Sequence, residues 1–154
     1  METILITEDD KVLQTALNSA LKKEGYNVVQ AFNGQECLNK VKENKPDLIL
    51  LDIIMPRMNG MTALKILQED DTTKDIPVMI LTNLNDVPQV INVVEFEELD
   101  TEKTTPDLDS GEDPSKMLSA YLQNRFDSPN VGFFVKSDFK IADIIKAVRK
   151  MLNK

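Results

Sequence analysis

The chain has 154 residues, of which 42% are hydrophobic and 29% charged, a mixture typical of one globular domain with its own core. Its single cysteine, Cys37, excludes an internal disulfide framework, and the lack of histidine excludes a histidine phosphocarrier or a histidine base. No run approaches the ~18 apolar residues of a membrane span, and no leader-like segment begins the chain. We therefore expect a cytoplasmic protein with no membrane anchor.

The net charge of −8 is concentrated in one part of the chain. Residues 85–130 hold 11 acidic and 3 basic side chains, which leaves 15 of each sign in the rest of the sequence. An acidic segment repels phosphate backbones, so a direct nucleic-acid partner is not expected. A DNA-binding output domain is not expected either, because the sequence ends with its last helical segment.

Short apolar runs alternate with segments of helical periodicity along the chain. The runs that predict strands are residues 4–6, 26–30, 47–51, 77–81 and 131–135. In the first helical segment, apolar residues recur from Val12 to Leu21 and stop before Gly25. Later helices are predicted to begin at Asn33-Gly34, after Gly60, near Pro114 and near Ile141, the last with Asp138 as a candidate N-cap.

The segment between the fourth and fifth predicted strands is longer than one crossover requires. Asp113-Pro114 is a good helix start, and we expect the crossover helix at about 114–126. Residues 86–112 then form an insertion, of which Val90–Phe96 fits either a strand or a helix. Its role is equally open between a solvated acidic loop and an ordered element that restricts which partner docks.

Five repeats of strand and helix predict an α/β fold, a doubly wound five-stranded parallel sheet. We expect a single domain over residues 1–154, interrupted by the insertion between the fourth strand and its helix. Ligands of such sheets bind at the carboxyl ends of the strands.

Polar residues follow four of the predicted strands and would meet at that edge. They are Glu8-Asp9-Asp10, Asp52, Thr82-Asn83 and Lys136-Ser137. Crowded carboxylates repel one another unless a cation lies between them. Oxygen ligands without histidine or cysteine favour a hard ion, and a small site favours Mg²⁺.

A carboxylate in such a site can act as a nucleophile toward phosphorus and form an aspartyl phosphate. Phosphoryl transfer requires positioning and neutralisation of the phosphoryl oxygens more than covalent catalysis. Mg²⁺ and Lys136 can supply positive charge, and the Thr82 hydroxyl can donate a hydrogen bond. The pattern therefore predicts a Mg²⁺-dependent phosphoacceptor that carries its phosphoryl group on Asp52.

The segments ILITEDD, LLDIIMPRMNG, ILTN and FFVKSDF resemble the successive motifs of response-regulator receiver domains of two-component signalling. The resemblance covers residues 1–84 and about 114–154. It implies that Asp52 is the phosphoacceptor, that Glu8 and Asp9 are the acidic pair of the metal site, and that Ile54 offers its backbone carbonyl to Mg²⁺. It further implies that Thr82, Lys136 and Phe133 are the signalling hydroxyl, the phosphoryl-contacting lysine and the aromatic switch residue.

The resemblance also implies partners and a mode of action. A histidine kinase or phosphotransfer protein would supply the phosphoryl group, and altered binding of a downstream protein would carry the signal. The protein would then be no enzyme, although it would assist its own phosphorylation and dephosphorylation. Two departures stand out: the acidic insertion, and Ser137 in place of the proline that usually follows the lysine, often through a cis peptide bond.

Two other classes of function remain as alternatives. A phosphatase of the haloacid-dehalogenase type would also form an aspartyl phosphate, but it carries Asp-x-Asp, and this chain has Ile54 two residues after Asp52. A receiver-like interaction module that is never phosphorylated would keep the fold without the chemistry.

Overall fold

The computed structural model describes residues 1–55, 57–83, 88–89, 111–125, 130–136 and 140–153. Its strands are β1 (Thr3–Thr7), β2 (Asn27–Ala31), β3 (Leu48–Asp52), β4 (Val78–Asn83) and β5 (Val131–Lys136). Its helices are α1 (Lys11–Lys23), α2 (Gly34–Glu43), α3 (Gly60–Glu69), α5 (Pro114–Arg125) and α6 (Ile141–Asn153). Strands and helices alternate as the sequence pattern predicts.

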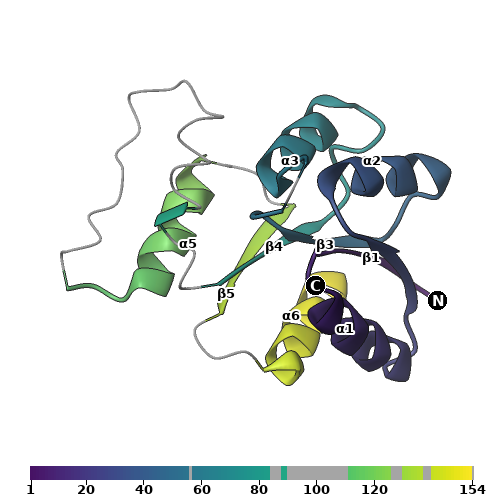
Figure 1. Ribbon diagram of the computed structural model, residues 1–154, viewed down its shortest axis with the longest axis horizontal. Helices are drawn as coiled ribbons and strands as arrows, with labels where there is room; N and C mark the ends of the chain where they lie inside the picture. Colours follow the sequence, from purple (N-terminus) through teal and green to yellow (C-terminus); the bar gives the residue numbers. More distant parts are fainter. Residues whose placement is uncertain (56, 84–87, 90–110, 126–129, 137–139, 154) are drawn as a thin grey trace.

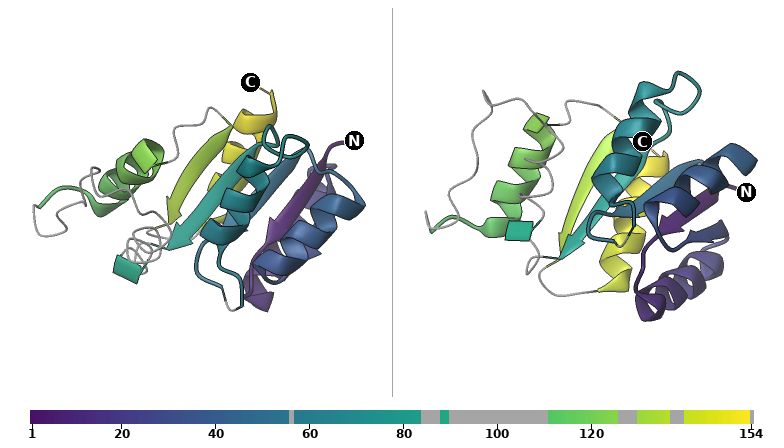
Figure 2. Two further views of the ribbon diagram at one scale, coloured as in Figure 1. Left: turned by 90° about the horizontal axis from the view of Figure 1, so that it is seen from above. Right: turned by 45° about the horizontal axis from the view of Figure 1, so that its top comes forward.

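The strands form one parallel sheet in the order β2-β1-β3-β4-β5, and their arrows point the same way in Figure 2. The predicted doubly wound, five-stranded sheet is therefore confirmed. The strand order reverses between β1 and β3, where the carboxyl edge of such a sheet forms its ligand-binding crevice.

Helices cover both faces of the sheet, with α1 and α6 on one face and α2 and α3 on the other (Figure 1). Alternate strand residues enter the two cores, because successive side chains of a strand point to opposite faces. In β3, Ile49 and Leu51 join the core under α2 and α3, whereas Leu48 and Leu50 join the core under α1 and α6. All four are fully buried, as expected of a central parallel strand.

Helix α1 ends before Gly25, as its sequence predicts. The backbone N–H of Gly25, which has φ 93°, donates to the Lys22 carbonyl at 3.0 Å and closes the helix. Val12, the first apolar residue of the segment, is 80% exposed. The inner face of the helix is instead centred on Gln14, Leu17 and Leu21, so Val12 lies on the opposite side.

All five strands end at least one residue beyond the predicted apolar runs, and these extensions include predicted site residues. The run 47–51 ends in the structure at Asp52, and the run 77–81 ends at Asn83. Ladder hydrogen bonds come from the backbone, so a polar side chain does not terminate a strand. As a result Asp52 and Thr82 lie on the strands themselves, where pairing with the neighbouring strands fixes their backbones.

The predicted crossover helix at 114–126 is present as α5, and its Tyr121 side chain is buried in the core under α2 and α3. The Met117 N–H donates to the Asp113 carbonyl at 3.1 Å, in keeping with a start at Asp113-Pro114. Residues 90–110 of the insertion, the proposed Asp138 cap and Ser137 lie outside the described residues. Among the helices that the structure describes, none is both long enough and apolar enough to cross a membrane.

Cys37 provides a test of the packing of α2. The side chain is fully buried, and this burial raises the pKa of the thiol to about 11, although the nearby Thr7 hydroxyl acts to lower it. A pKa of about 11 instead of 9.0 leaves about a hundredfold less thiolate at neutral pH. We expect native protein to resist alkylation by iodoacetamide at pH 7.5 and to react at the free-cysteine rate in denaturant.

The control is Ser19→Cys in a Cys37→Ala background, since Ser19 is exposed on α1. This variant should be alkylated rapidly in the native state. Equal native rates for the two cysteines would contradict the buried position of Cys37.

Candidate functional site

The register of the strands brings the predicted site residues to one edge of the sheet. Thr7 is paired with Leu51, so Glu8 and Asp52 are the next residues along β1 and β3. Asp52 is paired with Leu81, and Thr82 and Asn83 extend β4 beyond that level. Lys136 is the last residue of β5 and is paired with Asn83. The carboxyl ends of β1, β3, β4 and β5 therefore meet as the sequence predicts.

Three of the predicted residues form an acidic cluster at this edge. Carboxylate oxygens of Glu8, Asp9 and Asp52 all lie within 4.8 Å of one another. Glu8 is 4% exposed, Asp52 is half-buried and Asp9 is exposed, so the cluster opens to solvent on the Asp9 side. Three carboxylates at this spacing repel one another when ionised, so the cluster could hold a cation.

The donor set of the cluster fits a hard divalent ion. Its three side chains are all carboxylates, and oxygen ligands of this kind suit Mg²⁺, which keeps part of its water shell. Ile54, the predicted carbonyl ligand, is half-buried in the loop after β3, two residues beyond Asp52.

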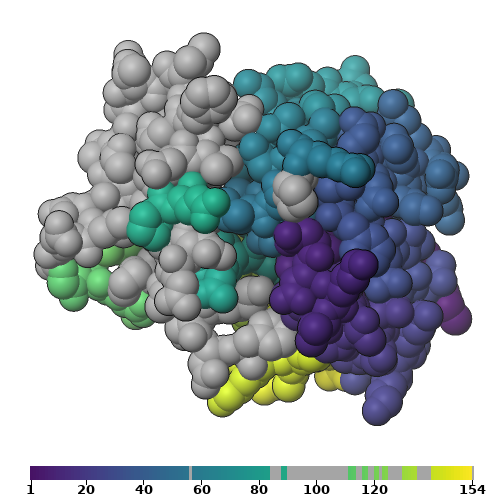
Figure 3. Space-filling model, viewed as in Figure 1, coloured from purple at the N-terminus to yellow at the C-terminus, as the bar shows by residue number. Residues whose placement is uncertain are grey.

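In the space-filling view the start of α1, in dark purple, lies against the blue and teal surface around α2 and α3 (Figure 3).

The loop between β3 and α3 is held against Asp52 by two glycines. The Gly60 N–H donates to the Ile53 carbonyl at 2.9 Å, and the Gly34 N–H donates to the Met58 carbonyl at 3.1 Å. A Cβ atom at Gly60 would collide with the Asp52 carbonyl oxygen, and one at Gly34 would lie 2.7 Å from the Met58 carbonyl oxygen. Both positions therefore require glycine because another backbone passes too close for a side chain.

Thr82 and Phe133 lie on the strands β4 and β5, on the side of the cluster away from β1. The Thr82 side chain is 1% exposed, and its hydroxyl oxygen has no hydrogen-bond partner among the described residues. Phe133 is half-buried and packs against the core under α2 and α3. A buried hydroxyl without a partner costs free energy, so Thr82 is suited to a ligand that reaches this edge.

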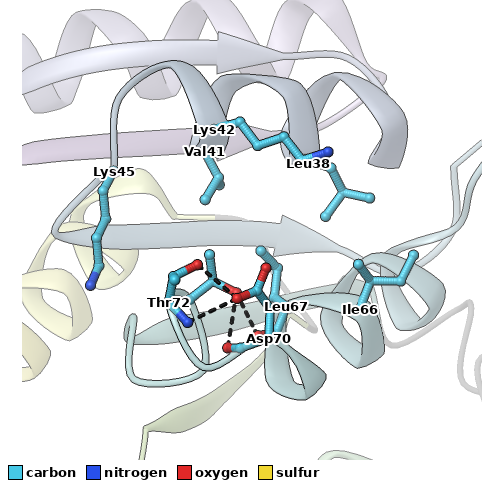
Figure 4. A pocket seen from close by; sticks show the side chains of 9 residues that line it. Leu38, Val41, Lys42, Lys45, Ile66, Leu67, Asp70 and Thr72 are labelled. Carbon is cyan, nitrogen blue, oxygen red and sulfur yellow. Dashed lines mark hydrogen bonds between the residues drawn. The ribbon is translucent and has the colours of Figure 1, made fainter.

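Two surface hollows lie in different parts of the fold. One adjoins the acidic cluster and is lined by Asp9, Lys11, Phe32, Asn33, Glu36 and Arg57. The other lies between the carboxyl-terminal ends of α2 and α3, where Leu38 and Lys42 face Ile66 and Asp70 (Figure 4). Hydrogen bonds from the Thr72 hydroxyl and N–H lower the pKa of Asp70. Since these helices run against the strands, the second hollow lies at the amino edge, away from the cluster.

The family model described as the response regulator receiver domain matches residues 4–101 of the chain. The chain belongs to this family. The matched range includes Glu8, Asp9, Asp52 and Thr82, whereas β5 lies beyond it. The resemblance predicted from the sequence motifs is thus confirmed, and the protein is a receiver domain of the two-component response regulators.

Individual relatives agree with this assignment. The receiver domain is 39% identical over 82 residues to Protein PilH of Pseudomonas aeruginosa, covering 53% of this chain and 68% of that protein. It is 35% identical over 95 residues to the probable transcriptional regulator ycf27 of Guillardia theta, covering 62% of this chain and only 36% of that protein. The chain thus spans little more than a third of ycf27, so nothing about that protein as a whole carries over.

The fold is also that of solved receiver-type structures. The chemotaxis protein CheY4 of Vibrio cholerae aligns over 99% of both chains with a TM-score of 0.65 and 21% sequence identity. At this identity the alignment establishes the common fold alone.

Sequence analysis did not single out Gln14, whose side chain contacts the Glu8 backbone of this receiver domain. Gln14 is 1% exposed, although a glutamine in a surface helix is usually solvated. The available signal was its spacing, because Gln14, Leu17 and Leu21 lie three and four residues apart on one helical face.

Substitution of Gly60 tests the close approach of α3 to Asp52. We expect Gly60→Ala to lower the free energy of unfolding by about 1–3 kcal/mol, because the new methyl group displaces the Asp52 peptide. Chemical denaturation measures the loss. Gly132→Ala is the matched control, since its Cβ would meet only the flexible end of Met151, 3.2 Å away, and it should cost less. An equal or larger loss for Gly132→Ala would contradict this explanation.

Proposed function

We propose that this receiver domain accepts a phosphoryl group on Asp52 in a Mg²⁺-dependent reaction and signals through altered binding to a partner protein. The acidic cluster carries the proposal. Glu8, Asp9 and Asp52 bring their oxygens within 4.8 Å at the carboxyl edge of β1 and β3, in a chain of the receiver family. The donor would be a histidine kinase or a phosphotransfer protein in the cytoplasm.

In the proposed reaction a carboxylate oxygen of Asp52 attacks the phosphorus atom of a phosphohistidine. The new bond is the P–O bond of an acyl phosphate, and the P–N bond to the imidazole breaks. The imidazole nitrogen keeps the electron pair of that bond and is left neutral or is protonated by solvent. Asp52 is half-buried at a strand end, a position that would orient its carboxylate while leaving it accessible to the donor.

Three groups of the chain would assist this transfer. Glu8 and Asp9, with the Ile54 carbonyl, would hold Mg²⁺, which supplies positive charge against the phosphoryl oxygens when it is bound. Thr82 would donate its hydroxyl to a phosphoryl oxygen, and Lys136 would pair with another. These residues assist the transfer to and from Asp52 without making the protein an enzyme that acts on a separate substrate.

The same contacts would link phosphorylation of Asp52 to a change in partner binding. Phosphorylation would draw the Thr82 hydroxyl, which has no partner among the described residues, toward the phosphoryl group. Phe133 packs beside β4 at the adjacent strand and would move inward into the space that Thr82 vacates. Such a shift would change the relative populations of two packings of the β4–β5 side, and with them which partner binds there.

Mass spectrometry of the intact protein tests the proposed chemistry. With Mg²⁺ and acetyl phosphate, wild-type protein should gain one phosphoryl group, and Asp52→Asn should gain none because it lacks the nucleophile. Removal of Mg²⁺ with EDTA should abolish the gain. The matched control is Asp47→Asn, a carboxylate at the opposite end of the β3 segment that accepts a hydrogen bond from the Thr3 N–H at 2.7 Å.

Asp47→Asn should be phosphorylated like the wild type. Equal phosphorylation of Asp52→Asn and wild type would contradict the assignment of Asp52. A folded wild type that gains no phosphoryl group from acetyl phosphate or from any cognate kinase would favour the interaction module without phosphorylation.

A further inference from the structure

Gln14 makes an unusual set of contacts at the carboxyl edge of β1 and β2. Its amide nitrogen donates to the carbonyl oxygens of Ile6 at 3.0 Å, Glu8 at 3.2 Å and Ala31 at 2.6 Å. Its amide oxygen accepts a hydrogen bond from the Gln30 amide at 3.1 Å. One side chain from α1 therefore connects the ends of two strands to the first turn of the helix.

The orientation of the Gln14 amide follows from its surroundings. Three backbone carbonyl oxygens surround one end of the amide, and carbonyl oxygens can only accept hydrogen bonds. The NH₂ group must therefore face them, with its two hydrogens shared among three acceptors. Because the side chain is 1% exposed, no water would replace this donor readily if the amide were removed.

These contacts act on the segment that carries the acidic pair. The Glu8 carbonyl that accepts from Gln14 belongs to the peptide joining Glu8 to Asp9. The Glu8 N–H is held in turn by the Ala31 carbonyl at 3.1 Å, which also accepts from Gln14. Directly after the pair, the Asp10 carboxylate accepts from the N–H groups of α1 and fixes the start of that helix. The backbone of Glu8 and Asp9 is thus held from both sides.

We propose that Gln14 is a positioning residue that sets the geometry of Glu8 and Asp9 for a divalent cation. This inference rests on the proposed metal site and deepens it. Without the amide, the three carbonyl oxygens would lose the donor that they share, and the hydrogen bond from the Glu8 N–H to the Ala31 carbonyl would remain as a contact that holds the Glu8–Asp9 segment to β2. The two carboxylates would then no longer converge with Asp52, and the site would have to be rearranged each time an ion binds.

Measurement of Mg²⁺ affinity in three variants tests this role. Gln14→Met has a similar length and no hydrogen-bond donor, and its dissociation constant for Mg²⁺ should rise about tenfold or more, as for other residues that support metal ligands. Gln30→Met removes only the outer hydrogen bond to Gln14 and leaves the three bonds to the carbonyls. Its dissociation constant should stay within about twofold of wild type if the three carbonyl contacts are what matters.

Leu17→Val separates positioning from stability. Leu17 is fully buried on the same face of α1 and makes no contact of this kind, so the variant should be less stable yet bind Mg²⁺ like the wild type. Isothermal titration calorimetry below the unfolding temperature gives each affinity, and thermal melts with and without Mg²⁺ give a second readout. The stabilisation by Mg²⁺ should shrink in Gln14→Met alone.

Each outcome decides the inference. Wild-type affinity in Gln14→Met would overturn it, and so would an equal loss of affinity in Leu17→Val, which would mean that stability alone is responsible. If Gln14→Met does not fold, Gln14→Leu replaces it with the same expectation. A folded wild type that binds no Mg²⁺ would instead contradict the proposed metal site and remove the basis of the inference with it.

Discussion

The mutual repulsion of three carboxylates at one edge of the sheet is the constraint on which the rest of this structure depends. Glu8, Asp9 and Asp52 come from two adjacent strand ends, and their oxygens approach within 4.8 Å. Such an arrangement is stable only if the surrounding backbone holds the side chains together or a cation neutralises them. The fold supplies the first condition through a central sheet whose strand β3 is apolar on both faces. A divalent ion would supply the second.

The groups that hold the carboxylates in place come from three directions. Gly60 lets the start of α3 lie directly against the Asp52 peptide, and Gly34 fixes the far end of the same loop through Met58. Gln14 holds the Glu8 carbonyl from the side of α1. None of these groups offers a carboxylate of its own, yet each contacts the backbone next to a carboxylate or the loop that follows it. A nucleophile that is positioned before its substrate arrives loses less entropy in the reaction.

The sequence alone allows the fold and the acidic cluster to be predicted because both depend on strong local signals. Central parallel strands are apolar on both faces, and their carboxyl ends must share one edge, so the sequence pattern predicts that Asp52 and Glu8 lie together. The spacing of Gln14 can indicate its buried face but not its contacts, because these involve three carbonyl groups that converge only in the folded chain.

The most direct test of the central claim is to locate the phosphoryl group on the chain. Reduction of the phosphorylated protein with borohydride converts an aspartyl phosphate to homoserine, and peptide mass spectrometry then identifies the residue. The account predicts homoserine at Asp52 and at no other carboxylate. Homoserine at another aspartate such as Asp9, or the longer alcohol 5-hydroxynorvaline at a glutamate such as Glu8, with Asp52 unmodified, would contradict it.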